Sequence, residues 1–258
     1  MHTYLVVGAS RGIGLGFVEE LLKDPDNHVL ATARAPARSP GLQALTASYP
    51  SSRLSILELD ITDTTSVSLA ASRAAASLGD GVGLDCLIHN AVLNLQVLTP
   101  FEDVDLAAFQ EELHTNTVAP LGVVRAFLPL LRQSAKSNPG GRATKLVFMS
   151  SGVGSIAGAP AWAGLSDTYS VTKVGLNMLA RRWGATLKKA GICTVILHPG
   201  WVDTDLGSFV DAWMAEHAPQ VPKLSRSDCA VQCLRVVRDA QIEDAVSFYS
   251  YDGSEIPW

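Results

Sequence analysis

Two side chains in the stretch DTYSVTK, Tyr169 and Lys173, are of types that together could transfer a proton. On a helix, residues four apart lie on one face, about one turn from each other. A phenol with an ordinary pKa of about 10 is a poor acid or base at neutral pH, and a nearby ammonium group favours the phenolate and lowers that pKa. The pair alone is also compatible with a surface helix on which the tyrosine ring covers the lysine stem.

A glycine-rich turn near the N-terminus indicates a second kind of chemistry. In LVVGASRGIGLG, Gly8, Gly12 and Gly14 follow an apolar run and open a helical pattern. Glycine adopts backbone angles that clash with a Cβ atom and lets a phosphate approach the main chain, while the N–H groups of the helix start attract its charge. We therefore predict a dinucleotide-binding turn. Its expected contact residues are Gly8, Ser10, Arg11, Gly12, Ile13 and Gly14.

The residue type after the second apolar run indicates which dinucleotide binds. Enzymes that prefer NAD usually carry Asp or Glu about 20 residues after the glycines. Here that position is Arg34, and no carboxylate lies between Val29 and Gly41. Arg11, inside the glycine turn, is a second cation. Two guanidinium groups favour a 2′-phosphate, so NADP(H) is the expected cofactor; the alternative is that both arginines only lie at a loop surface.

Short apolar runs alternate with longer helical patterns, and this alternation must position the residues named above. The expected strands are Tyr4–Val7, Val29–Ala33, Leu54–Leu59, Cys86–His89, Lys145–Met149, Thr194–Leu197 and Ala245–Tyr249. The expected helices span 13–24, 64–78, 105–135, 168–190 and 226–239, the last with Ser225 or Ser227 as its N-cap. This order predicts an α/β fold, a Rossmann-type doubly wound parallel sheet of about seven strands with helices on both faces.

A single domain is expected over residues 1–258, because the chain shows no internal repeat, low-complexity tract or interdomain linker. Pro139, Gly140 and Gly141 indicate an ordinary loop. The segment 203–225 interrupts the strand–helix rhythm and mixes aromatic residues with prolines. We expect it to be a lid over a substrate pocket; the alternative is a helical excursion that packs on the body.

Polar residues recur where the predicted strands end. Asp60 follows the third strand, Asn90 the fourth and Ser150-Ser151 the fifth, and Pro199-Gly200 follows the sixth. Because the carboxyl ends of the strands in a doubly wound sheet line one crevice, we expect these residues to face one groove. Asp60 would meet the adenine amino group there. Ile61 and Ala91 are the neighbours expected to contact the cofactor as well.

Composition argues against several other functions. The 258 residues are 47% hydrophobic with a formal net charge of −5 and no basic cluster, so we expect no nucleic-acid surface. No apolar run is long enough to span a membrane and no leader peptide is visible, which predicts a soluble, cytoplasmic protein without membrane contact. The four cysteines form no Cys-x-x-Cys pair; Cys229 and Cys233 supply half a zinc site at most, so no metal is expected.

Together, the ordered motifs resemble the short-chain dehydrogenase/reductase family over essentially the whole chain. The motifs are GASRGIG, NAV, HTNTVAPLG, SSG, YSVTK and HPGWVDT. The sequence looks closest to the branch with C-factor-like proteins and sniffer-type carbonyl reductases. It departs from the family at Val92, which replaces a glycine and is expected to narrow the pocket, and in the long stretch between Ser151 and Tyr169.

The resemblance implies a role for each residue of the site. Tyr169 would be the acid/base and Lys173 its helper, and both would contact the cofactor. Ser151 would be the carbonyl anchor, and Asn116 the holder of a proton-relay water. Ser151 matches the second serine of the family, which leaves Ser150 as structural. The residues that would hold the nicotinamide end are Pro199, Gly200, Val202 and Thr204. His89 and His198 are expected to be packed rather than catalytic.

The expected function is NADPH-dependent reduction of a ketone or aldehyde with Tyr169 as the general acid. A bulky apolar or aromatic substrate would follow if the side chains of Val153, Trp162, Trp201, Leu206, Phe209 and Trp213 line the pocket; such residues are equally common in cores. The long helices commonly pair across a two-fold axis in this family, so a homodimer or homotetramer is expected. Two alternatives stay open: a dinucleotide-binding regulatory or signalling protein of the C-factor type, and an alcohol dehydrogenase that works mainly by oxidation.

Overall fold

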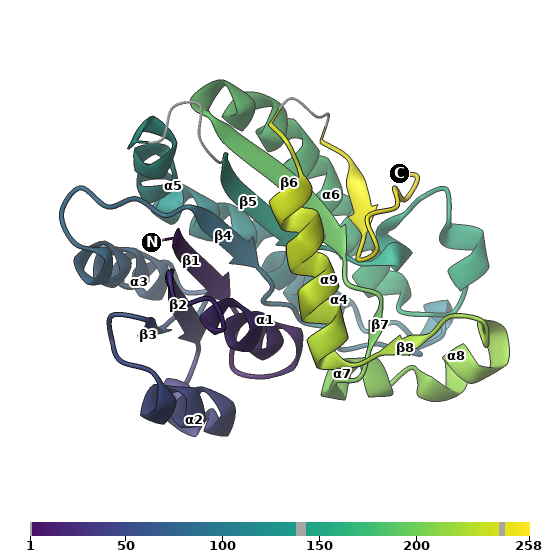
Figure 1. The fold of residues 1–258 in the computed structure, drawn as a ribbon. Coiled ribbons are helices and arrows are strands. Elements are labelled where there is room, and N and C mark those ends of the chain that lie inside the picture. Colours follow the sequence, from purple (N-terminus) through teal and green to yellow (C-terminus); the bar gives the residue numbers. More distant parts are fainter. Residues whose placement is uncertain (1, 138–142, 243–245) are drawn as a thin grey trace.

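The computed structural model describes residues 2–137, 143–242 and 246–258. At its centre is a seven-stranded parallel sheet with the order β3-β2-β1-β4-β5-β6-β9 (Figure 1). Its strands are β1 His2–Val7, β2 Asn27–Ala33, β3 Leu54–Glu58, β4 Cys86–His89, β5 Thr144–Met149, β6 Ile192–His198 and β9 Phe248–Ser250. The predicted doubly wound α/β fold is confirmed.

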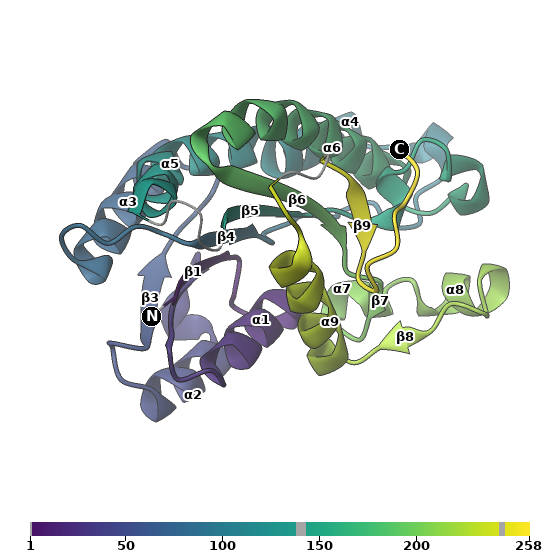
Figure 2. The same cartoon turned by 45° about the horizontal axis from the view of Figure 1, so that its top comes forward.

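Helices cover both faces of this sheet. In Figure 2, α1, α2 and α9 lie on one side, and α3, α4, α5 and α6 lie on the other. Their bounds are α1 Gly12–Leu22, α2 Pro40–Ser48, α3 Thr64–Leu78, α4 Leu106–Leu113, α5 Ala119–Ser137, α6 Asp167–Leu187 and α9 Arg226–Asp239. Each face has its own apolar core, so the strands between them are buried on both sides; all residues of β2 are buried. The predicted cap Ser225 accepts a hydrogen bond from Asp228 N–H and begins α9.

The strand order reverses between β1 and β4, because successive strands run outward from β1 on one side and from β4 on the other. At such a switch point the connections diverge to opposite faces and leave a crevice beyond the carboxyl ends of the strands. The glycine turn follows β1 and the Asn90 segment follows β4. The topology therefore brings together two segments that lie about 80 residues apart in the sequence.

The continuous helix predicted over 105–135 is wrong. The chain forms α4, then a π-helical turn over His114–Val118, then α5, and Ala119 N–H donates to the carbonyl of His114. Proline has no N–H, so Pro120 cannot supply the α-helical hydrogen bond to the carbonyl of Asn116. Periodic buried positions continue through the turn, which explains why the pattern reads as one helix.

Three smaller features differ from the elements that the sequence predicts. The first is helix α2, which the sequence pattern does not predict. The last strand begins at Phe248 rather than at Ala245, which lies outside the described residues, as do Pro139, Gly140 and Gly141. The stretch between Ser151 and Tyr169 contains two 3-10 turns, Gly152–Gly154 and Ala159–Trp162.

The segment 203–225 is ordered and has its own small framework. A two-stranded sheet pairs β7 Trp201–Val202 with β8 Lys223–Leu224, and the helices α7 Asp205–Ser208 and α8 Asp211–His217 lie between them. Lys223 Nζ lies 3.1 Å from Asp203 and 2.9 Å from Asp211. The segment is thus closed at its base by a strand pair and by charge contacts.

Candidate active site

A cavity of about 190 Å³ lies beyond the carboxyl ends of the central strands. Tyr169, Lys173 and Ser151 all line it, together with Ile13 of the glycine turn and Asn90 after β4. The other predicted cofactor residues in its wall are Pro199, Gly200, Val202 and Thr204. The structure therefore brings together the proton-transfer pair and most of the residues expected at the nicotinamide end.

The glycine turn has the shape of an anion cradle. Gly8 has a φ of +83°, and a Cβ atom on Gly14 would overlap the carbonyl oxygen of Gly8. Asn90 closes the turn from the neighbouring strand, since its Nδ2 donates to that same carbonyl at 2.9 Å. The residue before α1, Arg11, makes no side-chain cap, so the first N–H groups of the helix are left for another acceptor. A dinucleotide pyrophosphate fits this arrangement.

The two predicted cations occupy different surroundings. Arg34 is exposed after β2, and its charge, after the hydrogen bonds from Thr62, helps to lower the pKa of Asp60. Asp60 thus lies near Arg34 at the far end of the crevice. Arg11 pairs with Asp205 at 2.6 Å across the mouth of the site, in contact with the start of segment 203–225. Arg11 is therefore already engaged by a carboxylate in this structure.

Tyr169 and Lys173 are both buried on α6, as their spacing predicts. Lys173 Nζ lies 5.4 Å from the centroid of the Tyr169 ring and donates to the carbonyl of Met149 at 2.8 Å. Burial lowers the pKa of Lys173 to about 7. The expected lowering of the pKa of Tyr169 is not found: burial first, and the charge of Glu112 second, raise it well above its ordinary value. The phenol therefore remains protonated at neutral pH.

The two adjacent serines after β5 have different environments. Ser150 is buried and its hydroxyl donates to Asn177 Oδ1 at 2.6 Å. Ser151 is only partly buried and lines the cavity, and its hydroxyl bonds to no other described side chain. The geometry leaves Ser151, not Ser150, free to contact a ligand.

Both the oxygen and the nitrogen of the Asn116 side-chain amide form hydrogen bonds within the protein. Its Oδ1 accepts from Leu93 N–H at 2.8 Å, and its Nδ2 donates to the Leu93 carbonyl at 2.6 Å and to Thr172 Oγ1 at 3.1 Å. The Asn116 backbone carbonyl, which Pro120 leaves without an α-helical donor, is an acceptor for a water.

The predicted substrate residues divide into two groups. Val153, Trp162, Trp201 and Leu206 line the cavity. Phe209 and Trp213 do not: Phe209 is 66% exposed, and Trp213 packs with its ring centroid 5.9 Å from that of Trp162. The structure therefore does not place these two in the cavity wall: Phe209, just after α7, is exposed, and Trp213 on α8 packs against Trp162. Residues not expected in the wall are Asn94, Met149, Ser150, Gly152, Leu165, Ser166, His198, Gly207, Val210, Met214 and Val221.

The ring of His198 contacts the segment that carries Ser151, a contact that the sequence does not indicate. Its Nδ1 accepts a hydrogen bond from Gly152 N–H at 3.0 Å, next to Ser151. Burial lowers the pKa of His198 to about 4, so the ring is neutral at physiological pH. His89 is buried. His198 is half-buried and borders the cavity.

No metal centre is formed by the described residues, where no group of three His, Cys, Asp or Glu side chains is suitably placed. Cys229 and Cys233 are buried with their sulfur atoms 3.9 Å apart. Across the described ranges, no helix is both long enough and apolar enough to cross a membrane.

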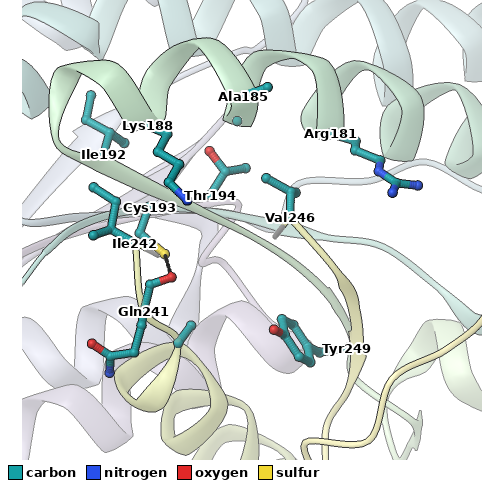
Figure 3. Close-up of a pocket in the computed structure, with 12 residues that line it drawn as sticks. Arg181, Ala185, Lys188, Ile192, Cys193, Thr194, Gln241, Ile242, Val246 and Tyr249 are labelled. Atoms are coloured by element: carbon teal, nitrogen blue, oxygen red, sulfur yellow. Dashed lines mark hydrogen bonds between the residues drawn. The ribbon is translucent and has the colours of Figure 1, made fainter. Parts of the chain in front are cut away.

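A second cavity, of about 260 Å³, lies at the opposite end of β6 (Figure 3). Its lining includes Cys193 and Thr194 of β6, Arg181 of α6 and Lys188 just after α6, and Cys193 Sγ donates to the Gln241 carbonyl at 3.4 Å. None of the proposed chemical groups lines this space. In a doubly wound sheet the ligand site lies at the carboxyl ends of the strands, which is where the first cavity lies.

The chain belongs to the short-chain dehydrogenase family of oxidoreductases, whose family model, described as short chain dehydrogenase, matches residues 2–215. An NADPH-bound carbonyl reductase from chicken fatty liver superposes with a TM-score of 0.89 at 33% identity, covering 100% of this chain and 94% of that one. The carbonyl reductase Sniffer of D. melanogaster gives a TM-score of 0.88 at 28% identity, with 100% of both chains covered. The C-signal protein of Myxococcus xanthus is 33% identical over 175 residues, which are 68% of this chain and 93% of that protein.

Proposed function

We propose that this protein is an NADPH-dependent reductase of bulky apolar or aromatic ketones and aldehydes. The observation that carries the proposal is the meeting of Tyr169, Lys173 and Ser151 in one cavity with the glycine turn and the segment 199–204. The likeness to an NADPH-bound carbonyl reductase supports it.

The residues proposed to hold the cofactor run along the crevice. The glycine turn would hold the pyrophosphate, Arg11 and Arg34 the 2′-phosphate, Asp60 and Ile61 the adenine, and Asn90 and Ala91 the middle of the molecule. The nicotinamide end would lie against Pro199, Gly200, Val202, Thr204 and Lys173. A reduced nicotinamide supplies hydride when bound.

In this proposal, Tyr169 and Ser151 bind the carbonyl oxygen of the substrate and Tyr169 gives it a proton. Burial keeps the Tyr169 phenol protonated, and this is the form that a reduction requires. Two hydrogen-bond donors aimed at the oxygen stabilise the negative charge that develops there. The Lys173 ammonium stabilises the phenolate left behind, and a water on the Asn116 carbonyl would return the proton.

The apolar wall favours a substrate with an aromatic or aliphatic body. Trp162, Trp201, Leu206 and Val153 line the cavity around the polar residues, and Val92 is also in its wall. The segment 203–225 contributes Leu206, Val210 and Met214 to this wall. We propose that this segment acts as the substrate lid within a single domain.

The direct test is NADPH oxidation with a panel of aromatic and quinone-like ketones. The reaction is monitored by the loss of the absorbance of the reduced nicotinamide. We expect turnover of several bulky carbonyl compounds. NADPH binding without turnover of any carbonyl or alcohol in the panel would favour the signalling alternative, which the likeness to C-signal supports. Faster oxidation of the matching alcohols by NADP⁺ at neutral pH would favour an alcohol dehydrogenase.

The substitution Arg34→Asp tests the cofactor preference. A carboxylate repels the 2′-phosphate and bonds the ribose hydroxyls, so the ratio of kcat/KM for NADPH over NADH should fall by about 10- to 100-fold. Arg132→Asp, on the exposed face of α5, is the matched control and should leave the ratio unchanged. Tighter binding of NADH than of NADPH by the wild type would contradict the preference.

We also propose a homodimer or homotetramer built on α4, α5 and α6. Val171 and Met178, two turns apart on α6, are 50% and 59% exposed, and Val118 beside them is 55% exposed. Val171→Glu should shift the species seen by light scattering towards the monomer, since a charge would be buried. Leu69→Glu, at an exposed position of α3, should not. A monomeric wild type at micromolar concentration would contradict this arrangement.

A further inference from the structure

The segment that follows β4 is held by hydrogen bonds on both sides of Asn94. Asn116 bonds both backbone groups of Leu93, at 2.8 and 2.6 Å. Glu112 Oε1 accepts from Leu95 N–H at 2.5 Å. Glu112 and Asn116 are four residues apart, and both are buried. The backbone of Asn94 is therefore fixed by two buried side chains.

The side-chain amide of Asn94 is also held by hydrogen bonding, to Ser166 at the start of α6. Asn94 Nδ2 donates to Ser166 Oγ at 3.1 Å, and Ser166 Oγ donates its proton to the Val97 carbonyl at 3.2 Å. Because a hydroxyl has one proton, Ser166 can only accept from Asn94. In this arrangement the amide presents its NH₂ group to Ser166 and its oxygen elsewhere, and the Ser166 proton goes to the Val97 carbonyl.

The local backbone at Ser166 shows how firmly this contact is built. Ser166 has a φ of +55°, and it is the only residue other than glycine with a positive φ in the described part of the chain. Its N–H donates to the Val97 carbonyl at 2.7 Å, and its carbonyl accepts from Ser170 N–H as α6 begins. A left-handed conformation is unfavourable for a residue with a Cβ, so the surrounding contacts hold it in place.

The oxygen of this fixed amide has no partner. Asn94 Oδ1 is buried and accepts no hydrogen bond from any described residue. Asn94 lines the same cavity as Tyr169 and Ser151. Buried amide oxygens are normally hydrogen-bonded, and an unpaired one at a binding cavity calls for a donor from a ligand.

We propose that Asn94 recognises the substrate by accepting a hydrogen bond from a hydroxyl group that the substrate carries in addition to its carbonyl. This inference rests on the proposed reductase function and narrows its substrate class to hydroxylated, mainly apolar carbonyl compounds. A neutral hydroxyl suits the cavity better than an ammonium group, because Lys173 lies in the same wall.

The test uses matched ligands that differ by one hydroxyl: acetophenone and its 3- and 4-hydroxy derivatives. With NADPH, the wild type should show a kcat/KM at least about 10-fold higher for one hydroxylated ketone than for acetophenone, because the amide oxygen stays unpaired with the latter. Asn94→Leu keeps the volume and removes the acceptor, so the ratio should fall to about one. Asn94→Asp keeps an acceptor oxygen and should keep the preference.

Binding measurements separate the two proposals. Titration of each ketone into the protein–NADP⁺ complex, followed by tryptophan fluorescence, reports recognition without turnover. A hydroxyl preference in binding that Asn94→Leu abolishes, without turnover of any ketone, supports recognition and contradicts the reductase function. Turnover of all three ketones with equal kcat/KM overturns the recognition proposal and leaves the reductase function standing. The recognition proposal is also overturned if Asn94→Leu lowers kcat/KM by the same factor for all three ketones while its melting temperature is unchanged.

Discussion

Replacement of Tyr169 with phenylalanine is expected to lower kcat for carbonyl reduction by about 100- to 10,000-fold, the usual range for loss of a general acid. The ring, its burial and its contact with Lys173 Nζ are kept, while the proton and one donor to the carbonyl oxygen are lost. The dissociation constant for NADPH should change by less than about threefold, since the hydroxyl is not among the groups that hold the phosphates. Stopped-flow turnover and a fluorescence titration measure the two quantities.

Tyr49→Phe is the matched control for this change. Tyr49 follows α2, lies away from the cavity, and has the guanidinium of Arg53 5.9 Å from its ring centroid. Its substitution should leave kcat unaltered. If Tyr169→Phe keeps more than a tenth of the wild-type kcat, another group supplies the proton and the proposed mechanism is wrong.

Gly14→Ala is expected to have the second large effect. The added Cβ would overlap the carbonyl oxygen of Gly8 and lie 2.7 Å from Asn90 Nδ2, so the turn must open. Overpacking of this kind destabilises a fold by about 1–3 kcal/mol. It also breaks the hydrogen bond that Asn90 donates to Gly8 and displaces the N–H groups of α1, so affinity for NADPH should fall at least about 100-fold.

Gly122→Ala controls for the substitution type. A Cβ at Gly122 meets no atom within 4 Å, and alanine favours a helix over glycine by about 1 kcal/mol, so stability should rise slightly and NADPH affinity should not change. Thermal unfolding and NADPH titration of both variants give the comparison. Normal NADPH affinity in Gly14→Ala would show that the cofactor does not occupy the glycine turn.

Much of this site could be predicted because a doubly wound sheet converts sequence position into spatial position. Each residue directly after a strand comes to the same edge, so Asn90, Ser151 and Gly200 meet although they lie far apart in the chain. The choice of Ser151 over Ser150 also agrees with the geometry, since alternate residues after an extended strand face opposite sides. Both serines border the cavity, but the Ser150 hydroxyl is bonded to Asn177, while the Ser151 hydroxyl bonds to no other described side chain.

The features that could not be predicted depend on contacts between segments. Arg11 has an exposed carboxylate partner in Asp205, far along the chain, and no local pattern shows it. Phe209 and Trp213 have the right residue types for a pocket, but the short helices α7 and α8 decide which way they face. The pKa of Tyr169 follows the same rule: Lys173 is visible in the sequence, whereas burial and Glu112 are not.

The Lys173 ammonium has a consequence for the fold itself, through proton linkage. Burial moves its pKa from 10.5 down to about 7 in the folded chain, while the unfolded chain keeps the ordinary value. Between these two pH values the unfolded state binds more protons, so this residue makes the cofactor-free fold less stable as the pH falls from 10.5 towards 7. Below about pH 7 the full destabilisation by the buried Lys173 is present. An apolar residue at position 173 would avoid this cost, so Lys173 is a residue that the proposed chemistry requires at the expense of the stability of the fold.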